Sequence, residues 1–365
     1  MITGSSQADV ALIMVPADGN FVTSIAKGNL KAGEVQGQTR QHALLINLLG
    51  VKQVIVGVNK MDCDVAKYGK ERYDEISAEM ANMLKQVGWK SDFVKDSIPM
   101  LPISGWHGDN LLKKSDKMPW WNGVDVDVPE GPNKGKIHVT TLLDCLEKMV
   151  YLPVRSPDAA MRLPVSGVYK IKGAGDVLTG RVEQGTVTVG SEVKFVPTHT
   201  TANNCTGKVF KLEMHHKQIP DAAPGSNVGM NIKGLPSNNM PRVGDIMILK
   251  SDNTLKPVKS FVAQVKVMTH PGELKPGYSP IAFVRTARSA VKMTNIAWKI
   301  GKATGNKKLD NPPFLKANEM AEITFEPLQD FVIDTFKNCE GLGRFAVLEG
   351  GSVVMLGKVI SIEHK

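Results

Sequence analysis

Residues 53–62 read Gln53-Val54-Ile55-Val56-Gly57-Val58-Asn59-Lys60-Met61-Asp62, and this stretch decides the fold of the first part of the chain. The segment 53–58 is almost entirely apolar, which is typical of a parallel strand covered on both faces. Polar residues follow at once, and in open α/β sheets ligands bind beyond the carboxyl ends of the strands. The sequence therefore predicts a buried parallel strand with a ligand-binding loop directly after it.

Strands and helices alternate around this stretch. Residues 8–15 and 98–103 are further apolar runs, and we expect the strand at 8–15 to be buried on both faces. Helical spacing of apolar residues predicts helices at 39–49, 68–87 and 141–149. Gly50 and Gly88 follow the first two helices and are expected to end them. Strands separated by helices imply right-handed crossovers, so an α/β domain with a parallel sheet is predicted for residues 1–153.

The pattern changes after residue 157 to short β-rich runs separated by glycines. These glycines are Gly167, Gly173, Gly175, Gly180, Gly185 and Gly190. Turn residues at such short intervals are typical of antiparallel barrels or sandwiches. A turn-rich stretch at 250–257 precedes a second β-rich block. We therefore predict a multidomain fold, in which two antiparallel β domains, each a barrel or a sandwich, follow the α/β domain at 158–254 and 258–365.

The formal net charge of +9 is unevenly distributed along the chain. Residues 1–150 contain 17 Lys and Arg against 18 Asp and Glu, whereas residues 151–365 contain 28 against 18. A basic excess attracts polyanions through counterion release, so nucleic acid is the expected partner of the second part. A diffuse, solvated basic surface is the alternative.

Several functional classes find no support in the sequence. No apolar run approaches the ~18 residues that a membrane span needs, and the first residues do not resemble a secretory signal. The cysteines lack the paired spacing of a zinc or redox site, so we expect no metal site and free thiols in a reducing cytoplasm. They are Cys63, Cys145, Cys205 and Cys339.

The loop after the second strand carries Asn59, Lys60 and Asp62. A carboxylate such as Asp62 can accept hydrogen bonds from the ring N–H and the exocyclic amino group of guanine, a pair of donors that adenine does not offer. Lys60 is expected to lay its methylene stem along the base, and Asn59 to tie neighbouring loops together and reach the purine. The alternative for Asp62 is a helix N-cap or a turn residue.

The loop after the third strand carries Ser104, Gly105 and Trp106. We expect backbone N–H groups around Ser104 and Gly105 to donate to the guanine O6 and so to complete the reading of the base edge. The two loops together predict a guanine-nucleotide site at the carboxyl edge of the sheet.

The sequence contains no Gly-x-x-x-x-Gly-Lys-Ser/Thr motif, although a nucleotide site ordinarily has one to hold the phosphates. The chain also begins almost directly on the strand predicted at 8–15. We therefore expect Met1 not to be the true initiator and the chain to be truncated at its N-terminus.

The chain resembles elongation factor one-alpha along nearly its whole length and in the same order. The similar segments are 1–9, 37–42, 51–62, 102–106, 108–110, 162–165, 180–183, 213–216, 270–272 and 343–347. Three features depart from the family pattern, namely Gln41 in place of Glu and the divergent stretches 20–35 and 124–139. These departures favour the elongation factor-like branch of the family.

The resemblance implies a GTP switch of the translation factor type. A P-loop-type G domain, incomplete in this chain, would precede two barrels that clamp aminoacyl-tRNA in the GTP state and release it after hydrolysis. The implied cofactors are GTP or GDP and Mg²⁺, and the implied partners are aminoacyl-tRNA, the ribosome and a guanine nucleotide exchange factor. The family's phosphate loop, switch regions, Mg²⁺ ligands and catalytic histidine would precede Met1, so no catalytic residue is expected here, and the chain by itself is expected to lack GTPase catalysis.

The resemblance also suggests tRNA contacts in the barrels. The candidates are Arg181, Glu183, Lys275, Arg285 and Arg344, although Arg344 is equally compatible with a packing or turn role. Three other functions remain open: a sister translational GTPase of the release or rescue type, a sulfate-activation GTPase subunit, and a non-catalytic barrel protein with a relic G domain.

Overall fold

The computed structural model describes residues 8–28, 36–173, 175–268, 272–349 and 352–365. The chain divides after Val154 into two compact units. Parts of three segments used in the sequence analysis, 1–9, 20–35 and 270–272, lie outside the described residues. Among the described residues, no helix is long and apolar enough to cross a membrane.

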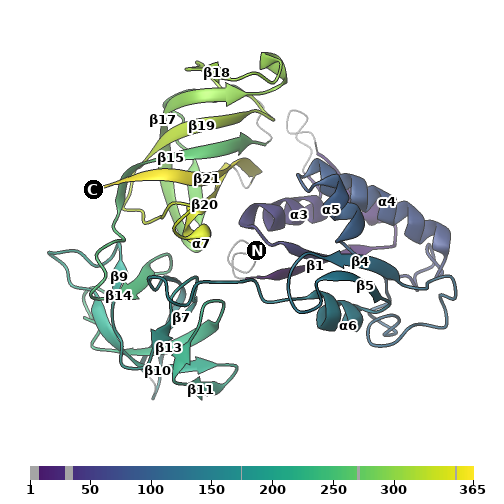
Figure 1. Cartoon of the computed structure of the whole chain (residues 1–365), viewed down its shortest axis with the longest axis horizontal. Coiled ribbons are helices and arrows are strands. Elements are labelled where there is room, and N and C mark those ends of the chain that lie inside the picture. Colours follow the sequence, from purple (N-terminus) through teal and green to yellow (C-terminus); the bar gives the residue numbers. More distant parts are fainter. Residues whose placement is uncertain (1–7, 29–35, 174, 269–271, 350–351) are drawn as a thin grey trace. The chain divides into compact units, whose positions relative to one another are not determined.

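The first unit is built on a three-stranded parallel sheet with the order β1-β2-β3 (Figure 1). Its strands and main helices are, in chain order, β1 (Val10–Pro16), α2 (Phe21–Ile25), α3 (Gln38–Leu49), β2 (Gln53–Asn59), α4 (Lys70–Gln86), α5 (Ser91–Asp96) and β3 (Met100–Pro102). The strand order advances in one direction, so right-handed crossovers place α3 and α4 on the same face of the sheet. The predicted parallel sheet is therefore confirmed.

The central strand β2 is buried from Gln53 to Val58, as its apolar sequence predicts. Gly57 lies where a Cβ atom would come within 2.8 Å of the Met14 sulfur and 3.0 Å of Ile103. Glycine at this position therefore lets the neighbouring strands and their side chains pack closely.

The edge strand β1 differs from the prediction. Ile13 and Val15 are buried, but Leu12 and Met14 are 41% and 42% exposed. The expectation that 8–15 is buried on both faces is therefore wrong, because β1 is the edge strand of the described sheet and only one of its faces is covered there.

Two features of the first unit were not predicted. An antiparallel hairpin of β4 (Val124–Val128) and β5 (Gly135–Val139) follows the third strand. The helix expected at 141–149 consists of α6 (Leu142–Asp144) and a π-helical turn, η2 (Cys145–Met149). It begins in a capping box, in which the Thr141 hydroxyl accepts from the Asp144 N–H and the Asp144 carboxylate accepts from the Thr141 N–H.

The second unit contains two antiparallel barrels, as predicted. The first barrel closes through β10-β13-β7-β6-β14-β9, because β9 also pairs with β10, and β11 extends it. Its strands are β6 (Leu163–Ile171), β7 (Gly175–Arg181), β9 (Glu192–Val196), β10 (Thr206–Met214), β11 (Lys217–Ile219), β13 (Asn227–Lys233) and β14 (Ile246–Leu249). The short strands β8 (Val187–Thr188) and β12 (Asp221–Ala222) pair separately.

The second barrel closes in the same way through β16-β20-β21-β15-β19-β17, because β16 also pairs with β17, and β18 extends it. Its elements are β15 (Val258–Val267), β16 (Ile281–Val284), β17 (Ala287–Ile300), η3 (Lys302–Thr304), β18 (Leu309–Asp310), β19 (Met320–Pro327), α7 (Glu340–Gly343), β20 (Arg344–Glu349) and β21 (Ser352–His364). Closure pairs the edges that an open sheet would leave free.

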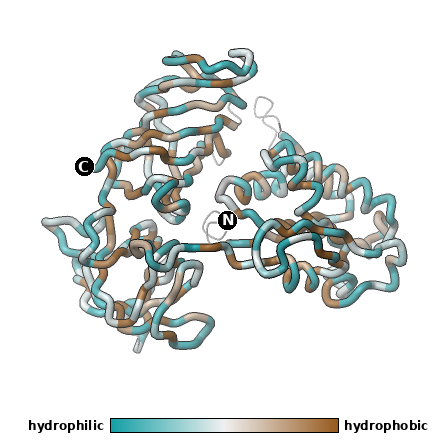
Figure 2. The backbone as a smooth tube through the Cα atoms, viewed as in Figure 1, coloured by the Kyte–Doolittle hydropathy of each residue, from teal (hydrophilic) through white to brown (hydrophobic). Residues whose placement is uncertain are grey.

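The cores of the barrels follow from strand alternation. Hydrophobic residues recur along the barrel strands in Figure 2, and the inward-facing side chains form the two buried clusters of the unit. The cluster of the second barrel also includes Val196, Ile246 and Ile248 from the first barrel. Shared apolar burial therefore joins the two barrels into one compact unit.

Candidate functional site

The two predicted base-reading loops lie side by side at the carboxyl ends of β2 and β3. The strands are parallel, with Val58 paired to Pro102, so the segments that follow them leave the same edge of the sheet. The Met61 N–H donates to the Ile103 carbonyl at 3.2 Å. The Ala17 N–H, just after β1, donates to the Asn59 carbonyl at 2.8 Å.

Asn59 joins these two loops through its side chain. Its Oδ1 accepts hydrogen bonds from the N–H groups of Lys60 and Gly105, both at 2.8 Å. This contact is the tie between neighbouring loops that the sequence suggested for Asn59. It holds the first loop against the second without any ligand.

Two backbone donors of the second loop are engaged within the chain. The Ser104 N–H donates to the Asp109 carbonyl at 3.2 Å, and the Gly105 N–H is held by Asn59. Neither group is therefore free in the structure, because the turn and the Asn59 side chain satisfy them. Within the described chain the Trp106 N–H makes no hydrogen bond, and the Trp106 residue is 88% exposed.

Asp62 is half-buried, and within the described chain its carboxylate makes no hydrogen bond or ion pair. A carboxylate in this state has its acceptor capacity open to a ligand that offers two N–H groups. Asp62 therefore has the property that base recognition requires of it.

Lys60 adopts a left-handed backbone conformation, with φ of 64°. Its Nζ lies 2.8 Å from Asp18 Oδ2, just beyond β1. The hydrogen bond between the two side chains lowers the pKa of Asp18 and raises the pKa of Lys60. Asp18 was not among the predicted site residues, although its place just after a strand was a signal.

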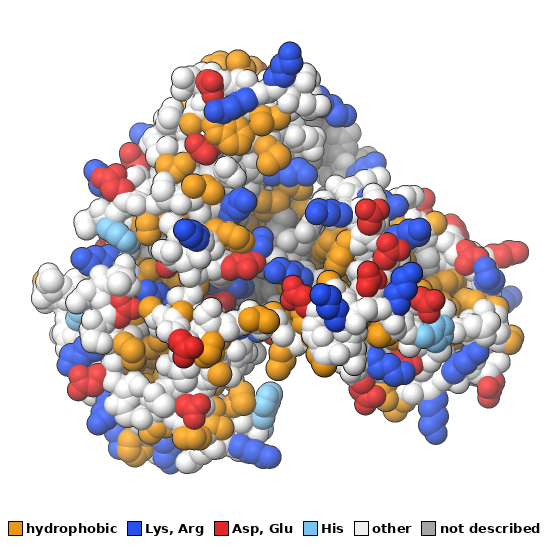
Figure 3. All heavy atoms as spheres, in the orientation of Figure 1, with side chains coloured by type: hydrophobic (Ala, Val, Ile, Leu, Met, Phe, Trp, Pro, Cys, Tyr) orange, Lys and Arg blue, Asp and Glu red, His pale blue; other side chains and the backbone are white. Residues whose placement is uncertain are grey.

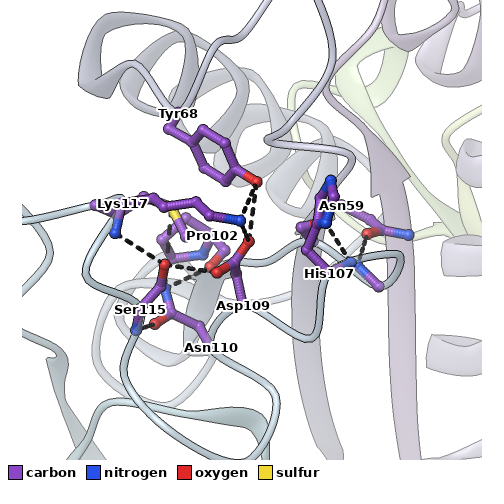
Figure 4. A network of polar contacts seen from close by, with 11 residues as sticks. Asn59, Tyr68, Pro102, His107, Asp109, Asn110, Ser115 and Lys117 are labelled. Carbon is purple, nitrogen blue, oxygen red and sulfur yellow. Dashed lines mark hydrogen bonds and ion pairs between the residues drawn. The ribbon is translucent and has the colours of Figure 1, made fainter.

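A polar network connects the same loops farther from the sheet (Figure 4). The Tyr68 hydroxyl donates to Asp109 Oδ2 at 2.9 Å, and Lys117 Nζ lies 3.3 Å from the same oxygen. The Ser115 hydroxyl donates to Asp109 Oδ1 at 2.7 Å. Sequence reasoning assigned no role to these residues, although Asp109 lies in the family-like segment 108–110.

The network also determines the charge state of Asp109. Burial alone would raise the pKa of this carboxyl group, but hydrogen bonds from Ser115, Tyr68 and Lys117 outweigh burial and lower its pKa. Lys117 correspondingly has a raised pKa, mainly through its hydrogen bond with Tyr68. The pair is therefore ionised at neutral pH.

The five candidate tRNA contacts occupy different environments. Arg181 is buried, at 4% exposure. Glu183 accepts a hydrogen bond from Arg285 at 2.9 Å, and both side chains are largely buried. Arg344 donates to Glu340 at 2.7 Å and lies over the ring of Phe336, and Lys275 is mostly exposed, 3.3 Å from Glu273.

The fold brings three of these candidates together, namely Glu183, Arg285 and Arg344. Gly341 of α7 leaves no room for a Cβ atom against the side chains of Glu183 and Arg285. Arg344 directly follows α7 and pairs with Glu340 in its first turn. Four charged side chains therefore gather around α7, and each cation in this group has a carboxylate partner.

Asn59, Asp62 and the Trp106 N–H provide the polar groups that a purine edge needs. Among the residues that the structure describes, no group of three or more His, Cys, Asp or Glu lies close enough together to hold a metal ion.

Comparison with known families agrees with this architecture. The model of the elongation factor Tu GTP-binding domain matches residues 1–151, that of elongation factor Tu domain 2 matches 175–248, and that of the GTP-eEF1A C-terminal-like domain matches 260–360. Fold and site together define a translational GTPase of the elongation factor Tu and 1-alpha type. Elongation factor 1-alpha from Tetrahymena pyriformis is 39% identical over 366 residues, which cover all of this chain and 76% of that protein. The chain belongs to the elongation factor 1-alpha family.

Two solved structures are similar to this chain. Sup35 in complex with GDP is 26% identical, with a TM-score of 0.51, and the match covers 99% of this chain and 80% of that one. The apo form of translation elongation factor SelB from Methanococcus maripaludis has a TM-score of 0.67 at 19% identity, over 98% of this chain and 64% of that one. The likeness to SelB concerns the fold alone.

Proposed function

We propose that this protein delivers aminoacyl-tRNA to the ribosome in the cytoplasm, with GTP hydrolysis acting as the release switch. The observation that carries the proposal is the pair of loops joined by Asn59 and Gly105, next to the open carboxylate of Asp62. This arrangement supports recognition of guanine, and the family supports the use of a guanine nucleotide.

Base recognition would work through complementary hydrogen bonds. The Asp62 carboxylate accepts from the ring N–H and the exocyclic amino group of guanine, and the Trp106 N–H donates to O6. Gly105 can join as a donor when the Asn59 amide turns toward the base. Adenine does not offer this pair of donors to the carboxylate. Its binding would therefore leave a half-buried charge unpaired.

The tRNA would bind the two barrels. The basic excess of residues 151–365 supports this part of the proposal, since phosphate contacts dominate nucleic-acid affinity. On the face drawn in Figure 3, Lys and Arg side chains are spread over the surface among acidic ones. Lys275 is the most exposed of the proposed contacts, and Arg181, Glu183, Arg285 and Arg344 complete the set.

The proposal includes Mg²⁺ and an exchange factor as further components of the cycle. GTP bound to proteins of this kind carries Mg²⁺ on its phosphates. In the described part of the chain, no group of three or more His, Cys, Asp or Glu lies close enough together to hold that ion. This chain's own residues hold the base.

The test is retention of aminoacyl-tRNA on filters by the protein expressed from its complete coding sequence. We expect charged tRNA to be retained with GTP and lost with GDP, and uncharged tRNA to be retained poorly in both. A release-type or rescue-type GTPase, a sulfate-activation subunit or a relic barrel protein would show no GTP-dependent retention. That result would overturn the delivery function but leave the guanine site to be judged by nucleotide binding.

A further inference from the structure

Tyr68 makes a second connection between the base-reading loops. Its N–H donates to the Met61 carbonyl at 2.7 Å and so closes the first loop. Its carbonyl accepts from Trp120 Nε1 at 2.8 Å, and its hydroxyl donates to Asp109 at 2.9 Å. Every polar group of Tyr68 is therefore used, and two of the three reach the second loop.

The backbone at this point is held in a conformation that residues with side chains rarely adopt. Tyr68 has φ of 58°, and Lys67 before it has φ of 45°. Such conformations persist where surrounding contacts enforce them, and they cluster at ligand sites. The contacts of Tyr68 with Met61, Trp120 and Asp109 are of this enforcing kind.

Asp109 lies at the end of this connection that belongs to the second base-reading loop. Its carboxylate accepts from Tyr68 and Ser115 and pairs with Lys117, while its backbone carbonyl accepts the Ser104 N–H at 3.2 Å. We call Tyr68, Asp109 and Lys117 the brace. The brace is attached one residue from Asp62, at Met61, and one residue from Gly105, at Ser104.

We propose that the brace is a positioning device for base recognition, which sets the spacing between the Asp62 carboxylate and the backbone donors at 105–106. The inference rests on the proposed guanine site and deepens it, because none of the three side chains is assigned a contact with the base. N–H···O hydrogen bonds need a donor–acceptor distance of about 2.7–3.2 Å and weaken steeply when the angle at the hydrogen falls below about 120°. Loss of the brace therefore weakens the simultaneous hydrogen bonding of Asp62 and of the backbone donors to the guanine edge.

The affinity ratio of GDP to IDP measures this spacing. Hypoxanthine lacks the exocyclic amino group, so the ratio reports the second hydrogen bond to Asp62. Tyr68→Phe removes only the hydroxyl group, and Asp109→Asn removes the charge and replaces one acceptor oxygen by an N–H donor. We expect each variant to lower the ratio by about fivefold, as the loss of one well-placed hydrogen bond would do.

A double-mutant test separates positioning from a general loss of structure. If Tyr68 acts through Asp62, Tyr68→Phe lowers the ratio in the wild-type protein but leaves it unchanged in an Asp62→Asn background. Tyr73→Phe is the matched stability control, because its hydroxyl donates to the Met100 carbonyl at 2.7 Å, outside the brace. This control should lower Tm without changing the ratio.

Lysine variants supply a second matched pair. Lys117→Met removes the cation of the brace, whereas Lys114→Met removes an exposed cation of the same loop that pairs with Asn122 at 3.0 Å. Only Lys117→Met should lower the ratio. An unchanged ratio in Tyr68→Phe and Asp109→Asn would overturn the positioning role, whereas a wild-type protein without preference for GDP over IDP would overturn the guanine site itself.

Discussion

Asp62 is the residue on which nucleotide choice depends most directly. The Asp62→Asn substitution replaces an acceptor by a group that can also donate, so it should favour xanthine, which carries a carbonyl in place of the amino group. We expect GDP affinity to fall by about 100-fold, with a matching gain for XDP, since a hydrogen bond to a charged group contributes about 1.5–3 kcal/mol. Competition binding against GDP and XDP measures both changes.

Asp64→Asn is the control for this substitution. Asp64 lies in the same loop, is exposed and makes no hydrogen bond or ion pair within the described chain. The Asp64→Asn substitution removes the same charge and should leave the preference for guanine intact. A preference that stays with guanine in Asp62→Asn would refute the role of Asp62.

The sequence identified the types of residue at the site better than their hydrogen-bonding states. Asn59 and Asp62 could be found because they lie at and just after the carboxyl end of a buried strand. The engagement of the Ser104 N–H by Asp109 could not be found, because it depends on how a loop folds back on itself. The left-handed conformation of Tyr68 could not be predicted either, because aromatic residues do not favour it and long-range contacts impose it.

Helix ends in the first unit were predictable where glycine decides them. Gly50 caps α3 with φ of 80°, and Gly88 follows α4 with φ of 117°. The hairpin of β4 and β5 was missed, although residues 124–128 alternate Val and Asp, and Val126 and Val128 are buried. That alternation is the period of a half-buried strand. The π-helical turn η2 had no comparable signal.

The hairpin of β4 and β5 contains a pair that should respond to pH. Asp125 lies directly opposite His138, Nδ1 of the ring is 2.7 Å from Asp125 and Nε2 is 2.8 Å from the Asn122 carbonyl. The hydrogen bond with Asp125, followed by that with Asn122, raises the pKa of His138, and Asp144 adds to the effect. The charged ring therefore stabilises the hairpin fully below the unfolded pKa of about 6.5, and this contribution is lost as pH rises through the folded pKa.

An NMR titration of the His138 ring protons measures this effect. We expect a midpoint above about 6.5 in the wild-type protein, and Asp125→Asn should move it downward. Asp127→Asn removes the same charge from the same strand, opposite Lys136, and should move it less. Equal shifts in the two variants would show that general charge, and not the pair, raises the pKa.

At the scale of the whole chain, alternating strands and helices predicted an α/β domain and turn spacing predicted two β domains, but not how the barrels close. Closure depends on pairings between strands far apart in sequence, such as β16 with both β17 and β20. The apolar core that the two barrels share could not be predicted either. Val196 and Ile246 look like ordinary strand residues in the sequence and join this core only when both barrels are folded.

Glu183 and Arg285 should stabilise the unit of two barrels as well as lie near the proposed tRNA surface. Glu183 belongs to the first barrel and Arg285 to the turn before β17, and their 2.9 Å contact is largely buried. Removing one partner of a buried pair leaves an uncompensated charge, so Arg285→Ala should lower the free energy of unfolding of this unit by about 3 kcal/mol. Urea unfolding measures this loss.

The double variant Glu183→Gln with Arg285→Met distinguishes pairing from packing. It removes both charges, so it should be less destabilised than Arg285→Ala, because no buried charge is left alone. Lys275→Ala is the exposed control and should stay within about 0.5 kcal/mol of the wild-type stability. If Arg285→Ala leaves stability unchanged but reduces aminoacyl-tRNA retention, Arg285 acts mainly at the tRNA surface. A loss of stability that the double variant restores, with retention restored as well, would instead show that the pair serves tRNA binding by holding the barrels together.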